Sequence, residues 1–251
     1  MRKVSIISQK GGVGKTTTSM NLSHALMLAG KKVLMIDMDP QSNLTASLGL
    51  HGPGLNGIDS VLLDQGDINQ YIVNLKNGLD LIPAGDKLGE LEFVTKGGAE
   101  RGFRLEAALR KLKNKYDFVF VDCPPSAGLL GMNAIMATRE IIVPVSSDYL
   151  SMQGLSRILG IVQYIEEKLN RKNRKWILLT RFHQRRRLAR EVKEKVYRHF
   201  PRLVLATPIR ETVALAESPS YGKTIFEYRR SSRGAQDYSD LAKDILNGER
   251  A

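Results

Sequence analysis

The chain has 251 residues, of which 42% are hydrophobic and 25% charged, the balance of an ordinary globular protein. Its single cysteine, Cys123, excludes an intrachain disulfide and any metal site built from several cysteines. No apolar run approaches the roughly 20 residues that a membrane-spanning helix needs, and the apolar part of the N-terminus is too short for a secretory signal. We therefore expect a cytoplasmic protein without a membrane partner.

Short apolar runs alternate with helix-forming stretches along the whole chain. The runs predicted to be strands are 4–8, 33–37, 79–83, 118–122, 140–145, 176–180 and 203–207. Helices are predicted over 15–29, 104–114, 152–170, 186–199 and 234–247, and the Gly-rich stretches 48–57 and 84–102 are predicted to be long loops. Strands that are apolar throughout and alternate with helices indicate a mainly parallel, doubly wound α/β sheet with helices on both faces. No composition break divides the chain, so we expect one domain over residues 1–251.

The first predicted strand leads into a Gly-rich turn, "QKGGVGK", and then into a helix. This is the order of a phosphate loop, whose pattern is G-x-x-x-x-G-K-[ST], except that Gln9 stands at the first glycine. Glycines let successive backbone N–H groups converge on phosphate oxygens, and the helix N-terminus adds a partial positive charge. The fold is thus predicted to be a P-loop sheet, with a nucleotide held by Lys10, Gly11, Gly12, Val13, Gly14, Lys15, Thr16 and Thr17.

Three of these residues have side chains suited to a nucleoside triphosphate with Mg²⁺. Lys15 is expected to contact the β- and γ-phosphates, and the Thr16 hydroxyl is expected to ligate Mg²⁺. Thr17 could donate to the α-phosphate. Lys10 is a second lysine at the mouth of the same loop, and on its own it could be a solvated side chain.

Aspartates stand at the ends of two predicted strands, in "VLMIDMDPQ" and "FVFVDCPPS". A carboxylate beside a triphosphate is repelled unless a cation or a water lies between them. Each of Asp37, Asp39 and Asp122 could alone be a helix cap. Together they point to the carboxyl edge of the sheet, where α/β proteins bind ligands.

The net charge of +12 comes from one segment. Residues 168–202 hold fourteen Lys and Arg against two acids, Glu191 and Glu194, and the rest of the chain is neutral. Such a surplus is typical of a surface that faces a polyanion, although it could also be a solvated helix face. Within it, Leu188, Val192, Val196 and Phe200 follow a four-residue spacing that predicts one apolar stripe on a helix.

The motifs "KGGVGKTT", "DMDPQSN", "FVFVDCPPS" and "LAESPSYGKTIFEY" occur in the order of the deviant Walker ATPases of the ParA/Soj partition type, which the chain resembles. The resemblance runs from Lys3 to about Asn247. It implies an ATPase with ATP, ADP and Mg²⁺ as ligands, weakly active alone, and a homodimer that forms with ATP. It also implies nonspecific binding to double-stranded DNA, localisation on the nucleoid, and a ParB-like activator protein in the segregation of a plasmid, a chromosome or another cargo.

The same resemblance assigns individual roles. Lys10 would contact the phosphates bound by the partner subunit and so act in catalysis together with Lys15 and Asp39. Asp37 and Asp122 would hold Mg²⁺ with Thr16, and Asp39 would position or activate the attacking water. Thr180 and Pro208 fall where the family contacts adenine.

The family binds DNA through basic residues near the charged segment. Arg185 matches one of them, but "IRET" at 209–212 replaces the usual "IPRN", and a second family arginine falls at Ala214. The DNA-contacting residues are therefore predicted to be Arg185, Arg186, Arg187, Arg190, Arg229, Arg230 and Arg233. Because aromatic residues are few there, contact with the duplex backbone is favoured over stacking on single strands.

Other functions of related architectures stay open. A MinD-like or other positioning ATPase is one, although the C-terminal tail is mixed in charge and lacks the basic amphipathic pattern of a lipid-binding helix. A small-molecule ligase is another, and a nucleotide-sensing regulator with little hydrolysis is a third.

Overall fold

The computed structural model describes residues 1–52, 54–93, 98–126 and 128–250. One sheet of seven strands runs through the molecule in the order β3-β4-β2-β5-β1-β6-β7. The strands are β1 (Arg2–Ile6), β2 (Val33–Asp37), β3 (Val73–Lys76), β4 (Leu79–Ile82), β5 (Phe118–Asp122), β6 (Glu140–Ser146) and β7 (Arg174–Thr180). Only the edge pair β3–β4 is antiparallel, so the predicted mainly parallel α/β sheet is confirmed.

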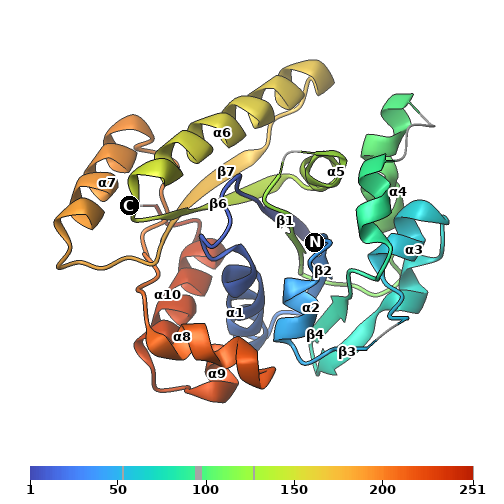
Figure 1. Cartoon of the computed structure of the whole chain (residues 1–251), viewed down its shortest axis with the longest axis horizontal. Helices are drawn as coiled ribbons and strands as arrows, with labels where there is room; N and C mark the ends of the chain where they lie inside the picture. The colour runs from blue at the N-terminus through green and yellow to red at the C-terminus, as the bar shows by residue number, and fades with distance from the viewer. Residues whose placement is uncertain (53, 94–97, 127, 251) are drawn as a thin grey trace.

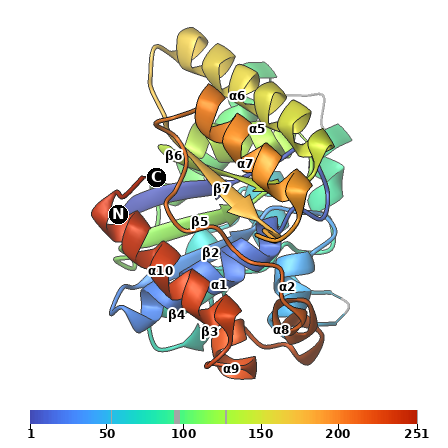
Figure 2. The same cartoon turned by 90° about the vertical axis from the view of Figure 1, so that its left-hand side faces the viewer.

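Helices cover both faces of this sheet (Figures 1 and 2). The α-helices are α1 (Lys15–Leu28), α2 (Asn43–Ser47), α3 (Ile58–Leu63), α4 (Arg104–Leu109), α5 (Leu129–Ala137), α6 (Tyr149–Leu169), α7 (Arg187–His199), α8 (Val213–Glu217), α9 (Ile225–Tyr228) and α10 (Arg233–Asn247). Short 3₁₀ segments are η1 (Ile68–Tyr71), η2 (Leu88–Phe93), η3 (Gly98–Phe103) and η4 (Ser218–Tyr221). Helices α1, α8, α9 and α10 lie on one side of the sheet, and α3 to α7 lie on the other.

Two apolar clusters, one on each face, hold these layers together. Met20, Leu22 and Leu26 of α1 pack with Tyr238 and Leu241 of α10 on one face. Residues of α4, α5, α6 and α7 form the second cluster against the other face. Because every strand residue of β2 and β5 is buried, their continuous apolar sequences are explained by contact with both clusters.

Several predicted elements differ from the structure. Residues 203–207 do not form a strand; Val204 and Leu205 make isolated bridges, to Ile177 of β7 and to Arg250. Strand β3 and helices α2, α3, α5, α8 and α9 were not predicted from the sequence, and the stretch 84–102 contains η2 and part of η3 as well as loop.

The apolar stripe predicted for α7 differs from the structure at its first position. Val192 and Val196 are buried as expected, but their neighbour on the buried face is Ala189, 1% exposed. Leu188 is 46% exposed, so its place in the stripe was predicted wrongly.

The sheet brings the ends of its central strands together. In the register of β2 and β5, Asp37 is the partner of Asp122, and in that of β1 and β5, Ile6 is the partner of Asp122. The loop after β1 therefore lies beside both aspartates. Among the described residues, no helix is both long and apolar enough to cross a membrane.

Candidate nucleotide-binding site

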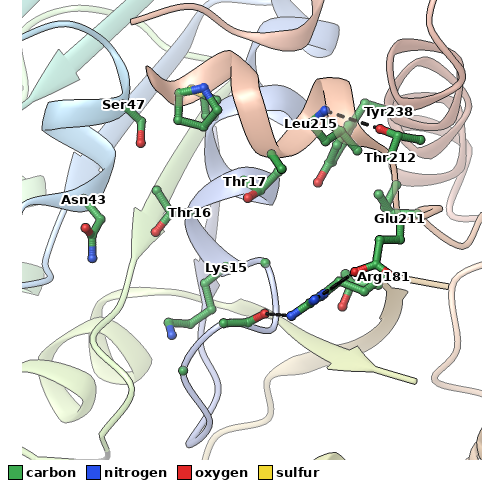
Figure 3. Close-up of a pocket in the computed structure, with 18 of the residues that line it drawn as sticks. Lys15, Thr16, Thr17, Asn43, Ser47, Arg181, Glu211, Thr212, Leu215 and Tyr238 are labelled. Atoms are coloured by element: carbon green, nitrogen blue, oxygen red, sulfur yellow. Dashed lines mark hydrogen bonds and ion pairs between the residues drawn. The ribbon is translucent and has the colours of Figure 1, made fainter. Parts of the chain in front are cut away.

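A cavity of about 470 Å³ opens at the carboxyl ends of these strands, and Figure 3 shows its lining. One wall is the loop between β1 and α1 with the first turn of α1, including Lys15, Thr16 and Thr17. The opposite wall is formed by the end of β7, the segment 209–219 and Tyr238 of α10. Asp39, Gln41, Asn43 and Ser47 complete it from the loop after β2 and from α2. The cavity therefore joins segments that are distant in sequence around the predicted phosphate loop.

The loop has the backbone that its glycines permit. Gly12 and Gly14 have positive φ angles of 71° and 86°, a region in which a side chain would be strained. Helix α1 starts directly after Gly14, so its free N–H groups face the loop. The Lys15 side chain lies within this cradle, and the residue is 7% exposed.

Thr16 is tied to the strand-end aspartate of β5. Its hydroxyl donates to Oδ2 of Asp122 at 2.7 Å, and the hydroxyl of Ser19 donates to Oδ1 at 2.8 Å. A threonine oriented in this way keeps its oxygen lone pairs available for a cation on the side away from Asp122.

Asp37 is fully buried beside this pair. It accepts bonds from the Thr45 hydroxyl at 2.7 Å, from the Thr45 N–H at 2.9 Å and from the Asp39 N–H at 3.1 Å. These bonds fold the chain after β2 back toward the strand end. Asp39 itself lines the cavity and accepts from the Gln41 N–H at 3.0 Å.

Burial disfavours the charged forms of both strand-end carboxylates. It raises the pKa of Asp37 to about 6 and that of Asp122 to about 7, and in Asp122 the nearby Asp37 charge acts in the same direction. A divalent cation beside them would favour ionisation instead.

The oxygen donors present here fit Mg²⁺. The described residues contain no cluster of three or more His, Cys, Asp or Glu able to hold a metal by itself. Mg²⁺ commonly needs no such cluster, because it takes one or two protein oxygens and completes its shell with phosphates and waters. The Thr16 hydroxyl and the carboxylates of Asp37 and Asp122 are the groups that would hold it, directly or through water.

Lys10 points elsewhere. Its Nζ lies 2.5 Å from Oδ1 of Asp148, the residue that caps the N-terminus of α6, and both side chains are partly exposed. Lys10 is not among the described residues that line the cavity of its own chain. Burial raises the pKa of Asp148, but bonds from Lys10, Ser146 and Ser151 outweigh it, so the net shift is downward.

Of the two residues predicted to contact adenine, one lines the cavity and the other does not. Thr180 lines the cavity, and its hydroxyl donates to the Val13 carbonyl at 2.7 Å. Pro208 precedes the wall formed by Ile209, Arg210 and Glu211 and is not among the described lining residues. Contact of either residue with a base stays a prediction.

Several residues of this wall were not predicted from the sequence. Arg181 pairs with Glu211, its Nη2 being 2.8 Å from Oε1. Arg210 forms a bidentate pair with Asp237 of α10. The hydroxyl groups of Tyr238 and of Thr18 in α1 share a hydrogen bond of 3.2 Å. The signal available was position: Arg181 directly follows a predicted strand end, where α/β proteins place residues that touch ligands.

The residues predicted to bind DNA are exposed and lie in two groups. Arg185, Arg186, Arg187 and Arg190 are on the β7–α7 turn and the start of α7, and Arg229, Arg230 and Arg233 lie between α9 and the start of α10. The segment 209–212 touches both groups, since Glu211 is 3.4 Å from Arg186 and Arg210 donates to the Arg233 carbonyl at 3.5 Å.

The charged segment 168–202 is not one surface. Lys168 and Lys172 lie where α6 ends and β7 begins, whereas Arg185 to Arg187 follow the other end of β7. Lys175 is already neutralised by Glu166, with Nζ–Oε distances of 2.6 and 2.7 Å. Among the described residues of this segment, Thr180 and Arg181 line the cavity, and Arg186 contacts Glu211 of its wall.

Comparison with known proteins identifies the family of the chain. A family described as "AAA domain" matches residues 1–175. The chain is 40% identical over 245 residues to the sporulation initiation inhibitor protein Soj of Bacillus subtilis, covering 96% of this chain and 97% of Soj.

Solved structures of similar fold support this assignment. A cobyrinic acid a,c-diamide synthase from Mycobacterium smegmatis with bound ADP and magnesium is 31% identical, with a TM-score of 0.84 over 98% of this chain and 94% of that one. A plasmid partition protein from Borrelia burgdorferi bound to AMPPNP is 25% identical, with a TM-score of 0.84 over 99% of each chain. The chain belongs to the AAA domain family and, within it, to the ParA/Soj-type partition ATPases.

Proposed function

We propose that this protein is a Mg²⁺-ATP-dependent switch of DNA or cargo partition, built as a single domain over residues 1–251. Without ATP it is a monomer, and with ATP two copies enclose the nucleotides between them. The ATP dimer binds double-stranded DNA of the nucleoid without sequence preference. A ParB-like activator stimulates hydrolysis to ADP and phosphate and so releases the dimer.

The cavity and the strand ends beside it carry groups suited to such hydrolysis. Lys15 and the N–H groups of the loop would bind the phosphates, and Thr16 with Asp37 and Asp122 would hold the cation. Bound Mg²⁺ would neutralise charge on the β- and γ-phosphates. Asp39 lines the cavity with its carboxylate held by the Gln41 N–H, which suits it to orient a water toward the γ-phosphate.

Lys10 supplies the dependence on a second copy. Its side chain is outside its own cavity, it is partly exposed, and it is held only by a surface ion pair with Asp148. Exchange of Asp148 for a phosphate of the facing subunit would place a cation where charge develops during phosphoryl transfer.

The observation that carries the DNA-binding role is the position of the basic turn. Arg186 of that turn and Arg181 of the cavity wall both contact Glu211, so the predicted DNA surface adjoins the nucleotide site. A surface in this position can respond to the nucleotide bound next to it.

The alternatives receive less support. In α10, Tyr238, Leu241 and Ile245 are buried against the sheet and α1, so this helix has no free apolar face for lipid as a MinD-like membrane ATPase would need. A ligase role is suggested by the name of one neighbour, which is 31% identical. The chromosome partitioning protein ParA of Myxococcus xanthus is more similar, at 36% identity, and a ligase reaction does not explain the basic turn.

The test compares DNA binding in ATP, ADP and no nucleotide, with Mg²⁺, over a series of salt concentrations, together with the oligomeric state by light scattering. We expect a dimer and a salt-sensitive DNA complex with ATP alone. A protein that stays monomeric with ATP and ignores DNA would refute the proposal. ATP hydrolysis that neither DNA nor an activator changes would favour the nucleotide-sensing regulator.

A further inference from the structure

The carbonyl groups of the phosphate loop are held from outside by neighbouring side chains. The Thr180 hydroxyl donates to the Val13 carbonyl at 2.7 Å, and Nη1 of Arg181 donates to the Gly12 carbonyl at 3.4 Å. Within the loop, the Ser8 hydroxyl donates to the Lys10 carbonyl at 2.8 Å. Two of these donors come from the end of β7, which is far from the loop in sequence.

Such bonds fix where the N–H groups point. In a planar trans peptide the C=O and the following N–H point in opposite directions. A Val13 carbonyl held toward Thr180 therefore directs the Gly14 N–H to the other side, and a Gly12 carbonyl held toward Arg181 does the same for the Val13 N–H. Without these bonds a glycine-rich loop would sample many orientations of its N–H groups, because glycine imposes few conformational restraints.

Arg181 has the backbone and the partner that this task requires. Its φ angle is 48°, a left-handed conformation that is costly for a residue with a side chain. The chain thereby turns sharply after β7, and the guanidinium extends between Glu211 and the loop (Figure 3). Glu211 accepts from both Nε and Nη2, at 3.1 and 2.8 Å, so it fixes the plane of the guanidinium.

We propose that Thr180 and Arg181, the latter held by Glu211, are positioning residues that brace the phosphate loop and set its affinity for the β-phosphate of a nucleotide. The proposal rests on the proposed function only in taking ATP and ADP as the ligands. Thr180 contributes more than Arg181, because its bond is shorter and the residue is 2% exposed, whereas the Arg181 side chain is 57% exposed.

This role differs from a contact with the base. The Thr180 hydroxyl hydrogen is used on the Val13 carbonyl, and its methyl carbon is 3.9 Å from where a side chain on Gly14 would begin. Both ends of the side chain thus face the loop. A base contact would affect every adenine nucleotide equally, whereas a brace of the loop affects those with a β-phosphate more than AMP, which offers the loop only its α-phosphate.

The experiment measures the dissociation constants of ATP, ADP and AMP, each with Mg²⁺, by calorimetry in a Lys10→Ala background, which is expected to keep the protein monomeric with ATP. Thr180→Val keeps the shape and removes the hydroxyl, and Thr180→Ser is the matched control that keeps it. Loss of about one hydrogen bond predicts roughly five- to tenfold weaker ATP and ADP binding in Thr180→Val. AMP binding should be unchanged, and Thr180→Ser should restore ATP and ADP binding.

Arg181→Gln and Glu211→Gln test the second part of the brace. Both should weaken ADP binding by less than Thr180→Val and leave AMP binding unchanged. Equal losses for AMP and ATP in Thr180→Val would overturn the brace and favour a base contact, and unchanged ADP binding in all three variants would overturn it outright. Because these measurements use no DNA and no dimer, they can fail while ATP-dependent DNA binding stands.

Discussion

At the scale of single residues, the two lysines of the phosphate loop are held very differently. Lys15 is enclosed, 7% exposed, whereas the Lys10 side chain is 37% exposed and pairs with an Asp148 side chain that is 39% exposed. An ion pair this exposed contributes little in water, about 1 kcal/mol or less. Lys10 can therefore exchange Asp148 for a phosphate at a small cost in free energy. Lys15, in contrast, is enclosed in the site of its own chain.

Lys10→Ala should abolish ATP-dependent dimerisation and lower activator-stimulated hydrolysis by about 10³-fold, the usual effect of a cation supplied in trans. ATP binding by the monomer should be almost unchanged, because Lys10 does not line its own cavity. Light scattering and calorimetry measure the two properties separately. Asp148→Asn is the matched control, since it removes the ion pair but keeps a capping side chain on α6, and failure of both variants to dimerise would contradict the role in trans.

Asp39→Ala removes the one aspartate of the three that lines the cavity. If Asp39 orients the attacking water, hydrolysis should fall by about 10²- to 10⁴-fold while ATP still binds. The ATP dimer should then persist on DNA, which a dissociation measurement after dilution into competitor DNA would show. Rapid release and turnover in this variant would reject the assignment.

At the scale of elements, α1 is tied to α9 by buried polar contacts. Asn21 in the middle of α1 accepts from the Ile225 N–H at 2.7 Å and donates to the Thr17 carbonyl at 2.8 Å. One turn further, Nδ1 of His24 is 2.7 Å from the Thr224 hydroxyl. Buried groups of this kind must keep their partners, so they fix α9 and the arginines that follow it relative to the phosphate-loop helix.

His24 makes this junction sensitive to acid. Burial lowers its pKa to about 4, outweighing the nearby Glu227 charge that raises it, and Lys76 and Arg230 lower it further. The unfolded chain takes up a proton near pH 6.5 and the folded chain does not, so stability falls as the pH drops from about 6.5 toward 4.

Thermal unfolding midpoints of the wild type and His24→Gln between pH 7.5 and 5 test this. The wild type should lose more stability over this range, since glutamine does not titrate and its amide can still form a hydrogen bond with the Thr224 hydroxyl. Glu227 titrates in both proteins, so the difference isolates His24. Parallel curves would show that His24 contributes nothing to the pH dependence.

The elements also show what sequence patterns can and cannot predict. Strand–loop–helix order was enough to place Lys15, Thr16, Asp37 and Asp122 at one edge of the sheet. Helix α5 was missed because "LLGMNAIMA" is apolar on all sides and has no helical period, being buried in a cluster. Segment 203–207 has the composition of a strand but pairs only through the isolated bridges of Val204 and Leu205, because strand formation depends on tertiary contacts.

One element that was not predicted does carry a recognisable sequence signal. The edge hairpin of β3 and β4 turns at Asn77-Gly78, with Gly78 at a φ of 91°, a dipeptide typical of tight hairpins. The cavity wall at Glu211 had no such signal, because a carboxylate that joins Arg181 to Arg186 is recognised only once β7 and the segment after it are placed side by side.

At the scale of the whole molecule, the positive charge of segment 168–202 is divided between two ends of the sheet. Arg185, Arg186 and Arg187 lie at the nucleotide end, and Lys168, Lys172 and Arg202 lie around the other end of β7. Total charge therefore does not predict DNA affinity, and the surface beside the nucleotide should account for most of it. If long-range electrostatic attraction alone determined DNA affinity, the two clusters would contribute equally, because this attraction depends on the summed charge.

Two triple variants with the same net charge separate these possibilities. Changing Arg185, Arg186 and Arg187 to glutamine should weaken DNA binding by the ATP form strongly and reduce the slope of log affinity against log salt by about 2.7, at roughly 0.9 for each phosphate that is no longer neutralised. Changing Lys168, Lys172 and Arg202 to glutamine should leave the slope almost unchanged. Fluorescence anisotropy with a labelled duplex from low to physiological salt measures both, and equal slopes in the two variants would reject the basic turn as the DNA-binding surface.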